Sequence, residues 1–115
     1  MTSPFSTSTE VADTGPILTV RGELDVATAP RLRTEVGGLE LGAGQLLVVD
    51  LAGVTFCDSS GISALIAARN AAEAARAGVA LVAVPSRITR TLGLTGLADF
   101  FPTYDSAEDA ISAHR

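Results

Sequence analysis

Apolar and polar positions divide the chain into short segments with different periods. Residues 6–12 can form a strand, and residues 17–23 alternate in character after a turn cluster at residues 13–16, which predicts a β-hairpin. Residues 46–49 and 79–84 are continuously apolar, as is typical of strands buried on both faces of a sheet. We therefore expect these two segments to lie side by side in one sheet.

Helical spacing of apolar residues separates these strands. A first helix is expected after Thr28, a candidate cap. A long helix is expected over residues 60–77, with Ser59 or Ser60 as its cap and Gly78 as its stop. The pattern predicts that its apolar side faces the sheet.

The last third of the chain repeats the pattern on a smaller scale. A third helix is expected over residues 85–92, and a short strand within the aromatic segment 100–104. Ser106 resembles the start of a capping box for a final helix over residues 107–113. The order β-β-α-β-α-β-α-β-α predicts one α/β domain over residues 1–115, with about five strands in a mostly parallel mixed sheet and residues 1–5 as a flexible tail.

Charge and composition narrow the classes of partner. The 115 residues contain 13 acidic and 8 basic side chains, every basic one an arginine, for a net charge of -5. This balance argues against binding to nucleic acid, which favours clustered basic residues. The apolar runs are far shorter than the ~20 residues that span a bilayer, and the Ser/Thr-rich start lacks the features of a secretory signal. With Cys57 as the single cysteine, we expect a cytoplasmic protein without a membrane or disulfide partner.

The inventory of reactive residues does not fit an enzyme. Ser59 lacks the glycine two positions earlier that a hydrolase elbow needs, because Cys57 stands there. The single histidine is His114, and the absence of lysine excludes a Walker A loop and the lysine chemistry of a phospho-aspartate receiver, although Asp50 follows a strand. We read Asp50 as a loop or capping residue, and we expect no catalytic residues, cofactor or metal.

The segment 58–61, Asp-Ser-Ser-Gly, lies between a predicted strand and the long helix. A hydroxyl there would stand at the carboxyl edge of the sheet, where α/β proteins place functional groups. Taken alone, the four residues favour a plain helix cap with a glycine for close packing.

The wider sequence resembles the STAS-domain family, and specifically the bacterial anti-sigma factor antagonists. Two motifs carry the resemblance, and the first is residues 22–25 followed by Thr28 and Ala29. The second is more specific and comprises residues 48–51, 54–56, 58–61 and Leu65. The order of elements also matches, so the resemblance extends over nearly the whole chain. Cys57 departs from the family, in which a larger apolar residue is common at this position.

The resemblance implies that Ser59, the first serine after Asp58, is phosphorylated by a partner that is both an anti-sigma factor and an ATP-dependent serine kinase. The unphosphorylated protein would bind that partner and release the sigma factor for transcription, phosphorylation would switch binding off, and a phosphatase would reverse it. The implied partner-binding residues are Asp25, Asp58, Ser59, Ser60, Gly61 and Ile62.

Two other functions remain open at this point. The chain could be a STAS module that binds a nucleotide or small molecule, although it offers no lysine or glycine-rich phosphate cradle. It could also be an unphosphorylated scaffold subunit of a signalling complex. Membrane transporters carry STAS domains as well, but the sequence contains no apolar run long enough to span a bilayer.

Overall fold

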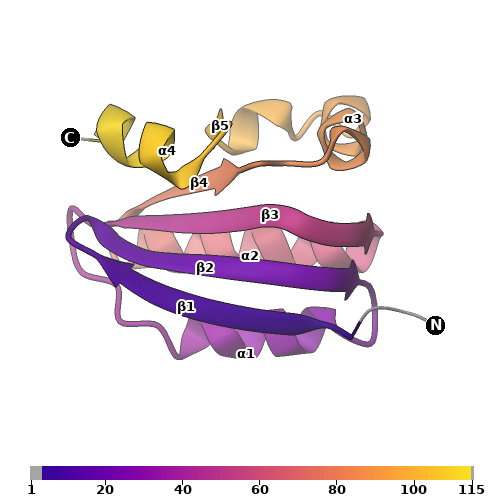
Figure 1. Cartoon of the computed structure of the whole chain (residues 1–115), viewed down its shortest axis with the longest axis horizontal. Helices are drawn as coiled ribbons and strands as arrows, with labels where there is room; N and C mark the ends of the chain where they lie inside the picture. Colours follow the sequence, from indigo (N-terminus) through magenta and orange to yellow (C-terminus); the bar gives the residue numbers. More distant parts are fainter. Residues whose placement is uncertain (1–3, 115) are drawn as a thin grey trace.

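The computed structural model describes residues 4–114, which fold into one five-stranded sheet with helices on both faces (Figure 1). The strands are β1 (Ser6–Ala12), β2 (Gly15–Leu24), β3 (Leu46–Cys57), β4 (Gly78–Val82) and β5 (Thr103–Tyr104). The helices are α1 (Ala29–Gly37), α2 (Ser59–Ala74), α3 (Ser86–Leu94) and α4 (Ala107–His114), with a 3-10 turn η1 (Ala98–Phe100) before β5.

The sheet has the order β1-β2-β3-β4-β5, with β1 antiparallel to β2 and all other neighbours parallel. This confirms the predicted hairpin and the predicted order of elements. Residues 46–50 pair with residues 78–82, so the two apolar segments are neighbours as expected. Parallel pairing places the carboxyl ends of β2, β3 and β4 at one end of the sheet.

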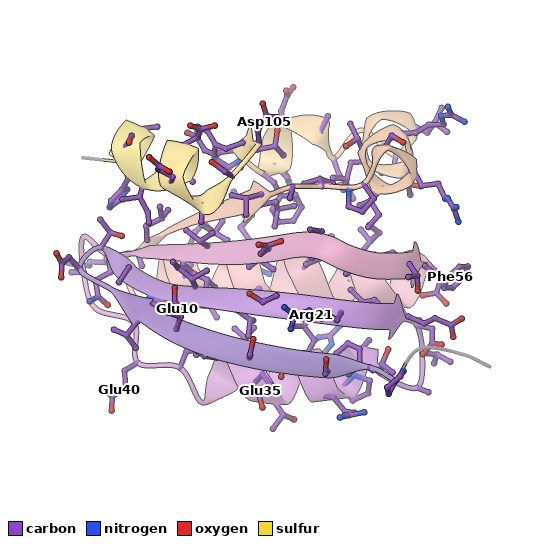
Figure 2. All side chains as sticks on the ribbon, in the orientation of Figure 1. Glu10, Arg21, Glu35, Glu40, Phe56 and Asp105 are labelled. Carbon is purple, nitrogen blue, oxygen red and sulfur yellow. The ribbon has the colours of Figure 1, made fainter. Side chains whose placement is uncertain are left out.

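The larger core fills the space between the sheet and helices α1 and α2, which lie behind the strands in Figure 1. Leu18, Val49 and Leu81 face this side and are fully buried. On the other face, α4 covers a smaller cluster that includes Val48 and Val82. Figure 2 shows Glu10 and Arg21 on the uncovered part of that face, over β1 and β2.

Strand β3 is much longer than the predicted apolar segment. It continues through Asp50, which is therefore a strand residue and not the loop residue we expected; its Oδ1 accepts a hydrogen bond from the Ala52 amide at 2.9 Å. The register between β2 and β3 shifts twice after Asp50, because β3 carries extra residues there. Such bulges bend a strand and increase its twist. Asp50 and Gly53 interrupt the continuous apolar run from which the strand was predicted.

The structure corrects several predicted boundaries. Asp58, and not Ser59 or Ser60, caps α2. Thr28 occupies the N-cap position of α1 as expected, but its side chain makes no cap hydrogen bond. Phe5, which we assigned to the tail, is buried with the Arg31 guanidinium 4.9 Å from its ring centre, whereas residues 1–3 of that tail lie outside the described part of the chain. Among residues 4–114, no helix is long and apolar enough to cross a membrane.

Candidate functional site at the strand-to-helix turn

The candidate site begins where β3 ends and α2 starts. Asp58 lies between them in an extended conformation, and its Oδ1 accepts hydrogen bonds from the amides of Ser60 at 2.9 Å and Gly61 at 3.2 Å. A carboxylate at this position satisfies amides that a helix start leaves free and also interacts favourably with the helix dipole. The turn is therefore fixed by Asp58.

The two serines of the turn differ in exposure. Ser59 is exposed, whereas Ser60 is partly buried. Within residues 4–114, no hydrogen bond engages the hydroxyl of Ser59. The turn thus exposes the hydroxyl of Ser59 to solvent, while the Asp58 carboxylate fixes the backbone next to it.

Gly61 explains how the turn can lie so close to β2. A Cβ atom at Gly61 would stand 2.6 Å from the Cys57 Sγ and 2.8 Å from the Leu24 carbonyl oxygen. Those distances are shorter than real Cβ contacts, so only glycine lets α2 begin here. Gly61 and Ile62 are both buried. These two residues therefore support the turn by packing beneath it. Of the predicted partner-binding residues, only the other four can contact a partner directly.

Asp25 lies in the neighbouring turn, between β2 and α1. The Asp58 amide donates to the Leu24 carbonyl at 3.2 Å, which joins the two turns. The Asp25 Oδ1 accepts from the amides of Ala27 at 3.0 Å and Thr28 at 3.1 Å, so this carboxylate holds its own turn. The structure therefore brings Asp25 and Asp58 together, as the two sequence motifs predict.

Two exposed apolar residues belong to this surface and were missed from the sequence. Val26, in the Asp25 turn, has 74% of its surface exposed, and Phe56, one residue before Cys57, has 47%. A valine inside a short polar turn was the available signal for the first. Phe56 gave none, because a phenylalanine near the end of a strand is usually core.

Cys57 lies below the turn and is partly buried. Burial, and secondly the negative charge of Asp58, raise the pKa of this thiol from 9.0 to about 11. The thiol is therefore protonated at neutral pH, and nucleophilic chemistry by Cys57 is disfavoured.

A groove lies beside the turn, between the end of β3 and α3; we call it the β3–α3 groove. It has a volume of about 350 Å³. Its lining residues are Val54, Thr55, Phe56, Cys57, Pro85, Arg87, Ile88 and Thr91. Arg87 is the one charged side chain among these described residues.

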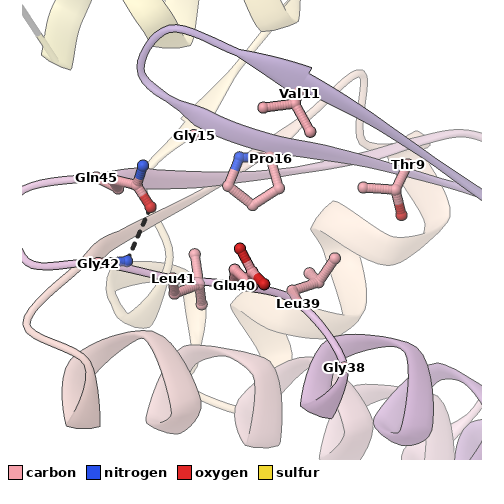
Figure 3. Close-up of a pocket in the computed structure, with 10 residues that line it drawn as sticks. All are labelled: Thr9, Val11, Gly15, Pro16, Gly38, Leu39, Glu40, Leu41, Gly42 and Gln45. Carbon is pink, nitrogen blue, oxygen red and sulfur yellow. Dashed lines mark hydrogen bonds between the residues drawn. The ribbon is translucent and has the colours of Figure 1, made fainter.

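A larger groove, of about 850 Å³, lies at the opposite end of the sheet, beside the β1–β2 turn (Figure 3). Its side chains are mainly apolar, with Val11, Pro16 and Leu39 pointing into it. The Gln45 Oε1 is already bonded to the Gly42 amide at 2.8 Å, and the charged residue is Glu40. The described lining residues offer a phosphate group no cation and one carboxylate, Glu40, so this groove does not support the nucleotide-binding alternative.

Comparison with known proteins assigns the fold to a family. The model of the STAS domain matches residues 6–110. The chain belongs to the STAS domain family. It is 31% identical to the anti-sigma-F factor antagonist RsfB of Mycobacterium tuberculosis, over 100% of this chain and 95% of that protein. It is also 31% identical to an anti-sigma factor antagonist of Mycobacterium paratuberculosis, whose crystal structure superposes with a TM-score of 0.81 over 100% of this chain and 99% of that one.

More distant STAS structures share the fold. The anti-sigma factor antagonist SpoIIAA in its unphosphorylated form is 17% identical, with a TM-score of 0.75, over 94% of this chain and 95% of that one. The predicted STAS-like α/β domain with a five-stranded mixed sheet is therefore confirmed.

Proposed function

We propose that this protein is an anti-sigma factor antagonist controlled by phosphorylation at Ser59. In its unphosphorylated form it binds an anti-sigma factor that is also a serine kinase, and the sigma factor is released. Phosphorylation of Ser59 ends that binding, and a phosphatase restores it. The protein acts in the bacterial cytoplasm as a substrate and a binding partner, not as an enzyme.

The observation that carries the proposal is the exposed hydroxyl of Ser59 on a turn that Asp58 holds rigid. A kinase must reach one hydroxyl and align it with ATP, and Ser59 is more accessible than Ser60. The similarity to two mycobacterial anti-sigma factor antagonists supports the kind of partner.

The position of Asp58 supplies the physical basis of the switch. The Asp58 carboxylate already accepts the amides of Ser60 and Gly61, so these amides are not free to bind a phosphate on Ser59. A phosphate adds a charge of about -1.5 to -2, and here it would be placed beside an existing carboxylate. Repulsion, bulk and the cost of removing water from the phosphate then oppose docking of a partner on this surface.

Exposed apolar residues near the Ser59 turn give the unphosphorylated surface its affinity in this proposal. Val26 lies in the Asp25 turn, which the bond from the Asp58 amide to the Leu24 carbonyl joins to the Ser59 turn, and Phe56 lies near the end of β3. Burial of exposed apolar surface of this kind favours association. A phosphate on Ser59, close to these side chains, would oppose their burial.

The direct test uses the kinase-type anti-sigma factor encoded nearest to this gene. Wild-type protein, Ser59→Ala and the matched control Ser60→Ala are incubated with it and ATP, and phosphate is located by peptide mass mapping. We expect wild-type and Ser60→Ala to be modified at Ser59, and Ser59→Ala to remain unmodified. Phosphate on Ser60 of the wild-type protein, with Ser59 untouched, contradicts the assignment.

Binding is measured on the same proteins without ATP. Ser59→Ala should bind the anti-sigma factor as wild-type does, whereas Ser59→Asp should bind about a hundredfold more weakly, which corresponds to about 2.8 kcal/mol. Equal binding by Ser59→Asp and wild-type protein, both folded by circular dichroism, would refute the charge switch.

A further inference from the structure

Strand β3 has a free edge next to the proposed switch. Its pairing with β4 covers residues 46–50 and stops at Asp50 and Val82, but β3 continues to Cys57. Over the same stretch its other edge stays paired with β2. Figure 1 shows β3 running well past the end of β4, with α3 above the overhang. The backbone groups on this side of residues 54–57 therefore have no strand partner among residues 4–114.

The chain leaves β4 in a way that keeps this edge open. Ala83 follows β4 with a positive φ of 52°, and the chain then turns away into α3 at Ser86. The β3–α3 groove separates α3 from the overhang. A free strand edge that borders a groove can accept an extended peptide as an added strand.

The charges of the groove select the kind of peptide. Helix α3 contains Arg87 and Arg90 and no acidic residue, in a protein whose net charge is -5. Arg87 lines the groove, whereas Arg90 is exposed on α3 and does not line it. The nearest acidic neighbour in the chain, Asp58, is engaged with the amides of Ser60 and Gly61. An acidic peptide thus finds a cation on one wall and backbone donors on the other.

We propose that the β3–α3 groove binds an extended acidic segment of the anti-sigma factor, which adds to residues 54–57 of β3 as a short strand and places a carboxylate against Arg87. This inference rests on the proposed function, because the groove is continuous with the Ser59 turn: Cys57 lines the groove and Asp58 follows it. The exposed ring of Phe56 forms its rim and provides apolar contact for the same segment.

The inference specifies a second point of contact, which the phosphate on Ser59 would not itself occupy. The phosphate would stand on Ser59, outside the lining of the groove. The groove would therefore hold the partner through backbone hydrogen bonds while the kinase site is engaged with Ser59. Four strand residues span roughly 13 Å, enough for two side chains of an added strand to face the groove.

The test is amide hydrogen exchange of the chain, free and in complex with the anti-sigma factor that binds it. We expect amides within residues 54–57 to exchange at least tenfold more slowly in the complex, together with the Ser59 turn. Protection of the Ser59 turn without protection of residues 54–57 would overturn the groove proposal and leave the proposed function intact.

A matched pair of charge reversals tests the role of Arg87. Arg87→Glu should weaken binding about tenfold or more, through loss of the ion pair and repulsion of the acidic segment, whereas Arg90→Glu on the same helix should change it less than about threefold. Circular dichroism and the urea midpoint show whether both variants fold as wild-type does. Equal effects of the two reversals would reject the specific contact at Arg87. Failure of every kinase-type anti-sigma factor of the source organism to bind the wild-type chain would instead remove both proposals.

Discussion

The turns after β2 and β3 are both fixed by an aspartate, but they differ in how they use a nearby hydroxyl. In each, an aspartate follows the strand, and one carboxylate oxygen accepts two backbone amides: Asp25 those of Ala27 and Thr28, and Asp58 those of Ser60 and Gly61. The two turns are joined by the bond from the Asp58 amide to the Leu24 carbonyl. A short carboxylate is thus sufficient to fix the backbone in both.

The two turns differ in the hydrogen bonding of their hydroxyl groups, Thr28 in the first turn and Ser59 in the second. Thr28, three residues after Asp25, donates to the Glu23 carbonyl at 2.7 Å and accepts from the Asp25 amide at 2.9 Å. The third residue after Asp58 is Gly61, which has no side chain to reach back, and the hydroxyl of Ser59 is only one residue away from Asp58 and exposed. A hydroxyl three residues after the aspartate, as in Thr28, bonds back to the turn, whereas a hydroxyl one residue after it, as in Ser59, stays exposed to solvent.

The largest effect that we expect from the second turn is on the reactivity of the Cys57 thiol. Raising the pKa from 9.0 to about 11 lowers the thiolate population near pH 8 by about a hundredfold. Alkylation by iodoacetamide at pH 8, followed by mass spectrometry, should be slower in the folded protein than in urea by about that factor. The single cysteine makes the assay unambiguous. Equal rates would show that the turn does not cover the thiol.

The same pKa has a consequence for stability. The folded state holds the thiol proton more tightly than the unfolded state, so this contribution is fully present below pH 9.0 and is lost as the pH rises through about 11. Between about pH 8.5 and about pH 10.5, the urea midpoint of Cys57→Ser should consequently fall less than that of the wild-type protein.

Close packing under the second turn gives the next largest effect. Gly61→Ala should lower the free energy of unfolding by about 2–3 kcal/mol, because its Cβ would overlap the Cys57 Sγ and the Leu24 carbonyl oxygen. Gly37→Ala is the matched control, since a Cβ there meets nothing within 4 Å at the end of α1. It should be neutral or stabilising, by up to about 1 kcal/mol. Urea unfolding measures both, and a similar loss in each would contradict the packing argument.

Much of the fold could be predicted from local pattern. Continuous apolar runs revealed β3 and β4, and the alternation of strands and helices required parallel neighbours. The pattern failed beyond Asp50, where Gly53 interrupts the apolar run and β3 bulges and loses β4 as a neighbour. Side chains at a bulged edge follow no period of two, so no local rule could extend the strand.

The site was predictable as a motif but not as a surface. The sequence placed Asp58 and Ser59 at a strand-to-helix junction, yet it could not decide which residue caps the helix, because serine and aspartate are both good caps. Nor could it indicate that Ile62 is buried while Phe56 is exposed. Both outcomes depend on how α2 meets β2 and on the register of β3, which are tertiary properties.

Removing each hydroxyl tests the difference between the two turns. Thr28→Ala deletes the hydrogen bonds that its hydroxyl makes with the Glu23 carbonyl, the Asp25 amide and the Asp25 carboxylate. It should lower the free energy of unfolding by about 1–2 kcal/mol, since these groups lose a partner. Ser59→Ala removes an exposed hydroxyl and should change it by less than about 0.5 kcal/mol. Both are measured by urea unfolding. An equal loss in the two variants would mean that Ser59 is structural too.

Removing the carboxylate of the second turn should have the smallest effect. Asp58→Ala leaves the amides of Ser60 and Gly61 without their side-chain acceptor and should cost about 1 kcal/mol, because water can replace part of the cap. Asp58→Asn keeps an oxygen in the same place and should cost only a few tenths of a kcal/mol. The asparagine variant also separates cap from charge: after phosphorylation of Ser59, its thermal midpoint should fall less than that of the wild-type protein, since a carboxylate no longer faces the phosphate. An identical fall in both proteins would assign the effect of the phosphate to its bulk and hydration, with no part for repulsion by Asp58.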